Sequence, residues 1–147
     1  MLSKDFILAG RAVFTLEVSK DFQSKYNTKP HYTYLVDFVE GKGKWSDSYF
    51  VKLLTGPDNT RSYSYIGKIR QEDGFIILTK KSNFTQESIP VKLLSRILKR
   101  IWSDECDKIS EAGFNLHHEG RCGRCGRVLT TPESIETGLG PICINKN

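Results

Sequence analysis

The sequence predicts an α+β protein with a small, mostly antiparallel β-sheet or barrel, one covering helix and a C-terminal zinc knuckle. Three observations support this fold class. Apolar and polar residues alternate through the first half of the chain, as they do in half-buried strands. In the segment SIPVKLLSRILKRIW the apolar residues change to helical spacing. Three of the four cysteines follow residue 120, in a pattern typical of metal ligands.

The predicted strands share an alternating pattern that turn-forming residues interrupt. In the first strand, Phe14, Leu16 and Val18 fall in one phase, and Thr15 and Glu17 fall in the other. The polar segment between this strand and the next is expected to be a loop, at residues 19–30. We expect strands at residues 6–18, 31–39, 48–54, 62–69 and 75–79.

The amphipathic segment after the strands predicts a helix that covers the sheet. Ser88 can cap its first turn, Pro90 is tolerated there, and the helix should end near Asp104. The strands and this helix together supply one apolar core. The residues predicted to form it are Phe14, Leu16, Val36, Phe38, Val51, Leu53, Ile77, Leu94, Ile97 and Leu98.

Composition and length indicate a β-rich domain with the helix at residues 1–108, followed by a knuckle module at 109–147. Hydrophobic residues make up 38% and charged residues 27% of the chain, as in globular proteins. No segment approaches the roughly 20 apolar residues of a membrane span, and the N-terminal segment does not resemble a signal peptide. We therefore expect a cytoplasmic protein without a membrane partner, in which clustered cysteines bind metal rather than form disulfides.

The terminal cysteines predict one structural zinc ion. Cys122 and Cys125 have the C-x2-C spacing of a knuckle, in which two thiolates on a tight turn bind the same ion. Gly123 and Gly126 suit such a turn. The chain after it has room for one short helix, starting near Thr131 and Pro132 and ending at Gly138, before Cys143 returns to the ion.

The fourth ligand has three candidates, which are His118, His117 and Cys106. In an extended segment His118 would share the apolar side with Leu116, and His117 would face solvent. Cys106 could reach the ion only if the end of the covering helix docked on the knuckle. Structural zinc accepts either three thiolates with one histidine or four thiolates, so the ligand chemistry leaves both sets open.

The sequence offers no enzymatic constellation. His117 and Glu119 form the H-x-E of zinc deaminases, but the later Pro-Cys-x-x-Cys of those enzymes is missing. A zinc hydrolase would need a general base that is not evident, and Asp58 in the sequence GPDN is explained by a turn. We therefore expect a binding protein without catalytic residues.

The net charge of +5 favours an acidic partner, of which nucleic acid is the commonest. Arginines interleave with the cysteines, where they either balance the charge of the thiolates or contact phosphates. Cationic positions of the helix could extend this surface, and tyrosines of the strands could stack on bases, although packing in the sheet explains them more simply. The predicted nucleic-acid-binding residues are Arg121, Arg124, Arg127, Arg96, Lys99 and Arg100.

The segment HEGRCGRCGRxLTxPESIxxGxGPxC resembles a short zinc-finger-like domain of unknown function that is widespread in bacteriophage proteins. The segments AGRAVFTL, HYTYLV, FVKLLTGPDN, YSYIG and LTKKS are similar to the region that precedes that domain. The family has a histidine four residues before its first cysteine, and this position falls on His118 here. The resemblance implies a phage origin and a zinc site of three cysteines and one histidine, and it implies no particular activity.

These observations predict a phage-encoded, non-enzymatic protein of the host bacterial cytosol that carries zinc and binds DNA or RNA. The alternative is a protein that binds and inhibits a host defence or transcription system. A basic surface that converges on one face would favour nucleic acid, whereas a dominant exposed apolar patch would favour a protein partner.

Overall fold

The computed structural model describes residues 3–44, 46–58, 61–119, 121–125 and 137–139. Within these ranges the helices are α1 (Lys4–Ile7), α2 (Lys20–Tyr26), α3 (Ile89–Trp102) and α4 (Cys106–Glu111). The strands are β1 (Arg11–Glu17), β2 (His31–Val39), β3 (Ser48–Leu54), β4 (Tyr63–Ile69), β5 (Ile76–Ile77) and β6 (Asn115–His118). No helix in the described ranges has the length and apolar character needed to cross a membrane.

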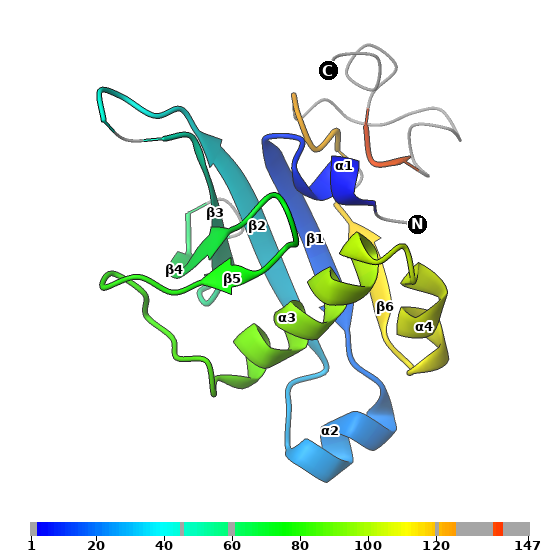
Figure 1. Ribbon diagram of the computed structural model, residues 1–147. Coiled ribbons are helices and arrows are strands. Elements are labelled where there is room, and N and C mark those ends of the chain that lie inside the picture. The colour runs from blue at the N-terminus through cyan, green and yellow to red at the C-terminus, as the bar shows by residue number, and fades with distance from the viewer. Residues whose placement is uncertain (1–2, 45, 59–60, 120, 126–136, 140–147) are drawn as a thin grey trace.

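All strands join one antiparallel sheet in the order β5-β4-β3-β2-β1-β6. Helix α3 lies across one face of this sheet, with α2 and α4 near one end of it and α1 near the other (Figure 1). The α+β class is therefore confirmed. The edge strand β6 comes from the segment after residue 108, so the sheet takes one strand from the C-terminal part of the chain.

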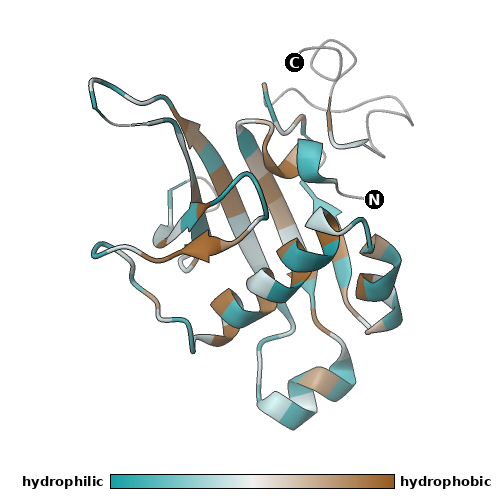
Figure 2. Ribbon diagram, in the orientation of Figure 1, coloured by the Kyte–Doolittle hydropathy of each residue, from teal (hydrophilic) through white to brown (hydrophobic). Residues whose placement is uncertain are grey.

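The core lies between the sheet and α3. Figure 2 shows apolar residues along the strands and along α3, with hydrophilic positions between them on the helix. The buried tyrosine Tyr34 of β2 donates its hydroxyl hydrogen bond to the carbonyl of Pro90 over 2.7 Å, which ties the sheet to the start of α3. The predicted core residues that are buried are Phe14, Leu16, Val36, Val51, Leu53, Leu94, Ile97 and Leu98.

Two predicted core residues were placed wrongly. Phe38 is 41% exposed and Ile77 is 40% exposed. Phe38 lies near the end of β2, where the burial of the strand decreases after Val36, and packs beside Tyr49 with the ring centroids 5.1 Å apart. On the two-residue strand β5, Ile76 is buried and its neighbour Ile77 points the other way, as alternation requires.

Local capping explains where the predicted strand 6–18 and the predicted loop 19–30 were wrong. Ser3 accepts a hydrogen bond from the backbone N–H of Phe6, so α1 replaces the start of the expected strand. Ser19 accepts one from Phe22 and starts α2 within the expected loop. Asn27 then ends α2 with a left-handed φ of 52°. The other predicted strands and the covering helix are present, and α4 was not predicted.

Candidate metal centre and nucleic-acid interface

Strand β6 determines which way the two adjacent histidines point. His118 lies opposite Phe14 of β1 and is half-buried, whereas His117 is exposed. The His117 Nε2 atom lies 3.2 Å from a carboxylate oxygen of Glu17. The His118 ring packs instead beside Phe6 of α1, with the ring centroids 5.9 Å apart. The predicted alternation of the two histidines is therefore confirmed.

The segment with the C-x2-C sequence forms a turn at residues 123–125. Cys122 is almost completely buried and packs with Leu139 and Ala9, whereas Cys125 is exposed. The backbone N–H of Arg124 points to the sulfur of Cys122 at 3.4 Å. A hydrogen bond of this kind stabilises a thiolate more than a thiol, because the acceptor is then charged. The sulfur of Cys122 thus accepts a hydrogen bond from its own turn.

Phe6 holds this turn against the sheet domain. An added Cβ on Gly123 would stand 2.8 Å from the Phe6 ring, and one on Gly138 would stand 2.3 Å from it. The backbone adds two hydrogen bonds, from the Arg11 N–H to the Gly123 carbonyl at 2.7 Å and from the Gly123 N–H to the Gly138 carbonyl at 2.8 Å. The fully buried ring of Phe6 therefore contacts the turn, residue 138 and His118 together.

The close approach of Phe6, rather than an unusual backbone angle, explains why residue 123 is a glycine. Gly138 has a φ of +75°, which suits the predicted end of a short helix, and it is also crowded by Phe6. The sequence carries no signal that Phe6 would lie beneath the knuckle, because Phe6 follows the same alternation as the strand residues after it.

The donor set suits zinc, but the metal site stays a prediction. Sulfur and imidazole nitrogen are the ligands that zinc prefers. Within the described ranges, no three His, Cys, Asp or Glu side chains form a group that could hold a metal ion. The predicted ligand Cys143 lies outside those ranges, as do Gly126, Thr131 and Pro132.

Cys106 lies in a different environment from Cys122. It is the first residue of α4 and packs against the main core, whereas Cys122 belongs to the small cluster with Leu139 and Ala9. Burial and the nearby Asp104 raise the pKa of the Cys106 thiol. Cys106 and Cys122 therefore belong to different clusters, and the choice of His118 as the fourth ligand stays a prediction.

The predicted nucleic-acid-binding residues lie in two places. Arg96, Lys99 and Arg100 occupy exposed positions of α3. Arg121 and Arg124 are exposed beside the cysteine turn, and Arg127 lies outside the described residues. The charge of Arg124 acts on Tyr49 of β3, whose pKa burial raises and Arg124 partly lowers. The helix and turn cations therefore line different parts of the surface.

The tyrosines that could stack on bases mostly serve the sheet. Tyr34 and Tyr32 are buried, and burial raises the pKa of the Tyr34 hydroxyl far above its usual range. Tyr65 is half-buried beside Phe50, with the ring centroids 5.6 Å apart. In the predicted turn Asp58 accepts hydrogen bonds from the backbone of Arg61, so it has a structural role.

The exposed aromatic residues near α3 were missed. They are Tyr26 of α2, 49% exposed, and Phe75 before β5, 55% exposed. The sequence pattern predicts a loop at Tyr26 and a strand at Phe75, and neither prediction places the ring next to the helix cations. The one signal in the sequence for such a surface was that a cation and an aromatic residue, Lys25 and Tyr26, are adjacent.

Residues 117–147 match a family of unknown function, DUF6011. The match covers the C-terminal part of the chain and includes all four predicted zinc ligands, His118, Cys122, Cys125 and Cys143. Neither the comparison with curated proteins nor the comparison with solved structures found a match. This segment is thus similar to a family whose members have no assigned function.

Proposed function

We propose that the protein is a phage-encoded, non-enzymatic nucleic-acid-binding protein with one structural zinc ion, which works in the host bacterial cytosol. The observation that carries the binding proposal is the charge of α3. Its described sequence contains Lys92, Arg96, Lys99 and Arg100 and no acidic residue, and all four cations are exposed. Such a face attracts phosphates wherever the cations are not neutralised by carboxylates.

The neighbouring carboxylates leave part of this charge uncompensated. Lys92 pairs with Glu87 at 3.0 Å, and Arg100 pairs with Glu105 at 3.1 Å. Glu105 is shared with Lys108. Arg96 and Lys99 form no ion pair with any residue in the described ranges. The phage origin rests on the resemblance of the C-terminal segment.

The zinc proposal rests on His118, Cys122, Cys125 and Cys143. Its support is the hydrogen bond from the Arg124 N–H to the Cys122 sulfur, together with the half-buried His118 over Phe6. A zinc ion there would crosslink β6 to the C-terminal segment. The three thiolates and one neutral histidine would leave a charge of −1 on the site, which the neighbouring Arg121 and Arg124 would balance.

Metal analysis tests the zinc site. Protein purified without chelator should contain about one zinc per chain, and His118→Ala or Cys122→Ser should lower its zinc affinity. The matched control is Cys106→Ser, which should leave the affinity unchanged. A zinc content near zero in the wild type, or loss of affinity in Cys106→Ser but not in His118→Ala, would contradict this ligand set.

Binding of labelled DNA and RNA at several salt concentrations tests the partner. If about three to five phosphates are contacted, the log–log slope against salt should be roughly −3 to −4.5 on duplex DNA. Replacing Arg96 and Lys99 by alanine should flatten it by up to about one unit for each phosphate that is no longer neutralised. Failure of the wild-type protein to bind either nucleic acid at low salt would overturn the proposal.

One observation favours the alternative, a protein that binds and inhibits a host defence or transcription system. Phe38 and Val39 are adjacent at the end of β2 and are 41% and 44% exposed, and Tyr49 packs beside Phe38. An exposed apolar patch of this kind suits a protein partner. Co-purification with a host protein that depends on Phe38 and persists after nuclease treatment would support this alternative.

A further inference from the structure

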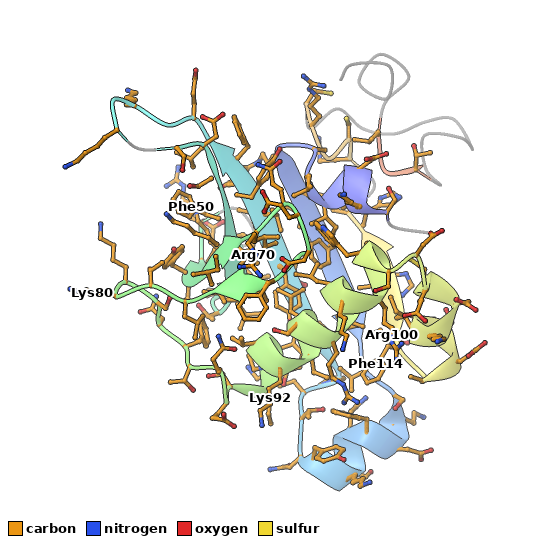
Figure 3. All side chains as sticks on the ribbon, in the orientation of Figure 1. Phe50, Arg70, Lys80, Lys92, Arg100 and Phe114 are labelled. Carbon is orange, nitrogen blue, oxygen red and sulfur yellow. The ribbon has the colours of Figure 1, made fainter. Side chains whose placement is uncertain are left out.

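Helix α3 forms a cationic ridge with a groove on each side. The ridge consists of Arg96, Lys99 and Arg100, and Arg96 lines both grooves. The first groove lies between α2, α3 and α4 and has a volume of about 550 Å³. The second lies between α3 and residues 73–76, with a volume of about 490 Å³. Figure 3 labels Arg100 and Phe114, which line the first groove, and Arg70, whose guanidinium lies beside Phe75 of the second groove.

The first groove combines an aromatic surface with cations. Tyr26, 49% exposed, packs on Phe22 with the ring centroids 4.5 Å apart, and Phe22 packs on Phe114 at 5.2 Å. The Lys25 ammonium lies 5.3 Å from the centre of the Tyr26 ring. The cations Lys25, Arg96, Arg100 and Lys108 line this groove with two acidic residues, Asp21 and Glu111, and Glu105 pairs with both Arg100 and Lys108. It therefore offers a ring for stacking and an excess of positive charge.

The second groove presents Phe75, which is 55% exposed yet held in place. Asp73 accepts hydrogen bonds from the Arg70 side chain and from the Phe75 N–H. These bonds hold the pKa of Asp73 at about 2. The Arg70 guanidinium lies 5.2 Å from the centre of the Phe75 ring. An exposed phenylalanine in so constrained a turn is preorganised for contact with a partner.

The turn that carries Phe75 is fixed to the ridge. Gly74 has a φ of +74°, and an added Cβ there would stand 2.7 Å from the Trp102 ring at the end of α3. The Trp102 indole N–H donates a hydrogen bond to the carbonyl of Gln71 over 2.8 Å. The backbone of the turn therefore holds Phe75 in the same groove as Arg96 and Lys99.

We propose that single-stranded nucleic acid crosses this ridge, with its phosphates on Arg96 and Lys99 and its bases stacked on Tyr26 and Phe75. This inference rests on the proposed function and assigns it a site and a strand state. A cationic track combined with exposed aromatic rings is the chemistry of single-strand binding, because a duplex hides the faces of its bases. An acidic peptide could use the cations but would gain little from the two rings.

Fluorescence anisotropy with a short labelled oligothymidylate tests the rings. Tyr26→Ala and Phe75→Ala should each raise the Kd at least about fivefold, because each variant lacks a ring on which one base stacks. Tyr26→Phe keeps the stacking ring and should bind like the wild type. The matched control is Phe38→Ala, which removes an exposed ring outside both grooves and should leave the Kd unchanged. Equal weakening by all three alanine variants would overturn the stacking site.

The ridge is tested by the salt dependence of Arg96→Ala, with Arg61→Ala as the exposed arginine control in the turn between β3 and β4. Arg96→Ala should flatten the log–log slope by about 0.7, the value for one phosphate of a single strand, and Arg61→Ala should not. A duplex that contains the same oligothymidylate strand should bind more weakly than the single strand. The site on α3 would be overturned if the duplex bound as tightly as the single strand, or if binding were lost only when Arg121 and Arg124 were replaced. Either result would still support the proposal that the protein binds nucleic acid. No binding to either strand state would overturn both.

Discussion

The ring of Phe6 occupies the space that a side chain on Gly138 would need, with its Cδ1 atom 2.3 Å from the position of an added Cβ. Phe6 and Gly138 are far apart in the sequence, but they are packed against each other as closely as neighbouring residues of a core. The same ring contacts Gly123 and lies beside His118. The C-terminal segment thus packs on α1 through the buried ring of Phe6, and this contact requires glycine at positions 123 and 138.

Gly138→Ala should detach the C-terminal segment from α1. The substitution combines a left-handed backbone, which costs roughly 1–2 kcal/mol for a residue with a Cβ, with a steric conflict worth about 1–3 kcal/mol. Gly43→Ala is the matched control, because Gly43 has a φ of +62° but no atom within 4 Å of the added Cβ. Hydrogen exchange at the Arg11 amide, which bonds to Gly123, should speed up in Gly138→Ala alone. Equal effects of the two substitutions would show that the contact with Phe6 contributes nothing.

Removal of zinc should produce a local change rather than global unfolding. The Arg11 and Gly123 amides both bond to carbonyls of the C-terminal segment, so they should lose protection when a chelator removes the metal. The central strand β3 is paired on both sides and should keep its protection. Cys122→Ser without chelator should reproduce the pattern. Loss of protection throughout β3 would mean that the metal supports the whole fold.

Alternation and helical spacing predicted most of the sheet and all of α3, because burial against one partner leaves a regular pattern. The pattern failed where a short polar contact determines the structure. Ser3 and Ser19 each cap a helix over a few residues, and alternation cannot distinguish these from an extended chain. For the candidate site, alternation correctly separated His117 from His118. The packing of the C-terminal segment on Phe6 depends on contacts between distant segments. A single sequence contains no periodic signal for such contacts.

Replacing the misassigned core residues should have little effect on stability. Phe38→Ala and Ile77→Ala remove exposed side chains and should each change the free energy of unfolding by less than about 1 kcal/mol. Phe14→Ala and Leu94→Ala empty buried positions and should cost about 3–5 and 2–5 kcal/mol. Urea unfolding of the four variants measures the difference. A cost for Phe38→Ala as large as that for Phe14→Ala would indicate that Phe38 is covered in solution.

Tyr34 should make the protein lose stability in alkaline solution. Burial, with a smaller contribution from Tyr32, raises the pKa of Tyr34, so the folded protein keeps a proton that the unfolded chain releases near pH 10. The stabilising contribution is complete below pH 10 and is lost above it, by about 1.4 kcal/mol for each pH unit. Tyr34→Phe removes both the titration and the hydrogen bond to Pro90, which costs about 1 kcal/mol at neutral pH. The free energy of unfolding of the variant, measured in urea between pH 9 and pH 12, should therefore fall less steeply than that of the wild type. Parallel curves would show that the Tyr34 hydroxyl ionises as easily in the folded protein as in the unfolded chain.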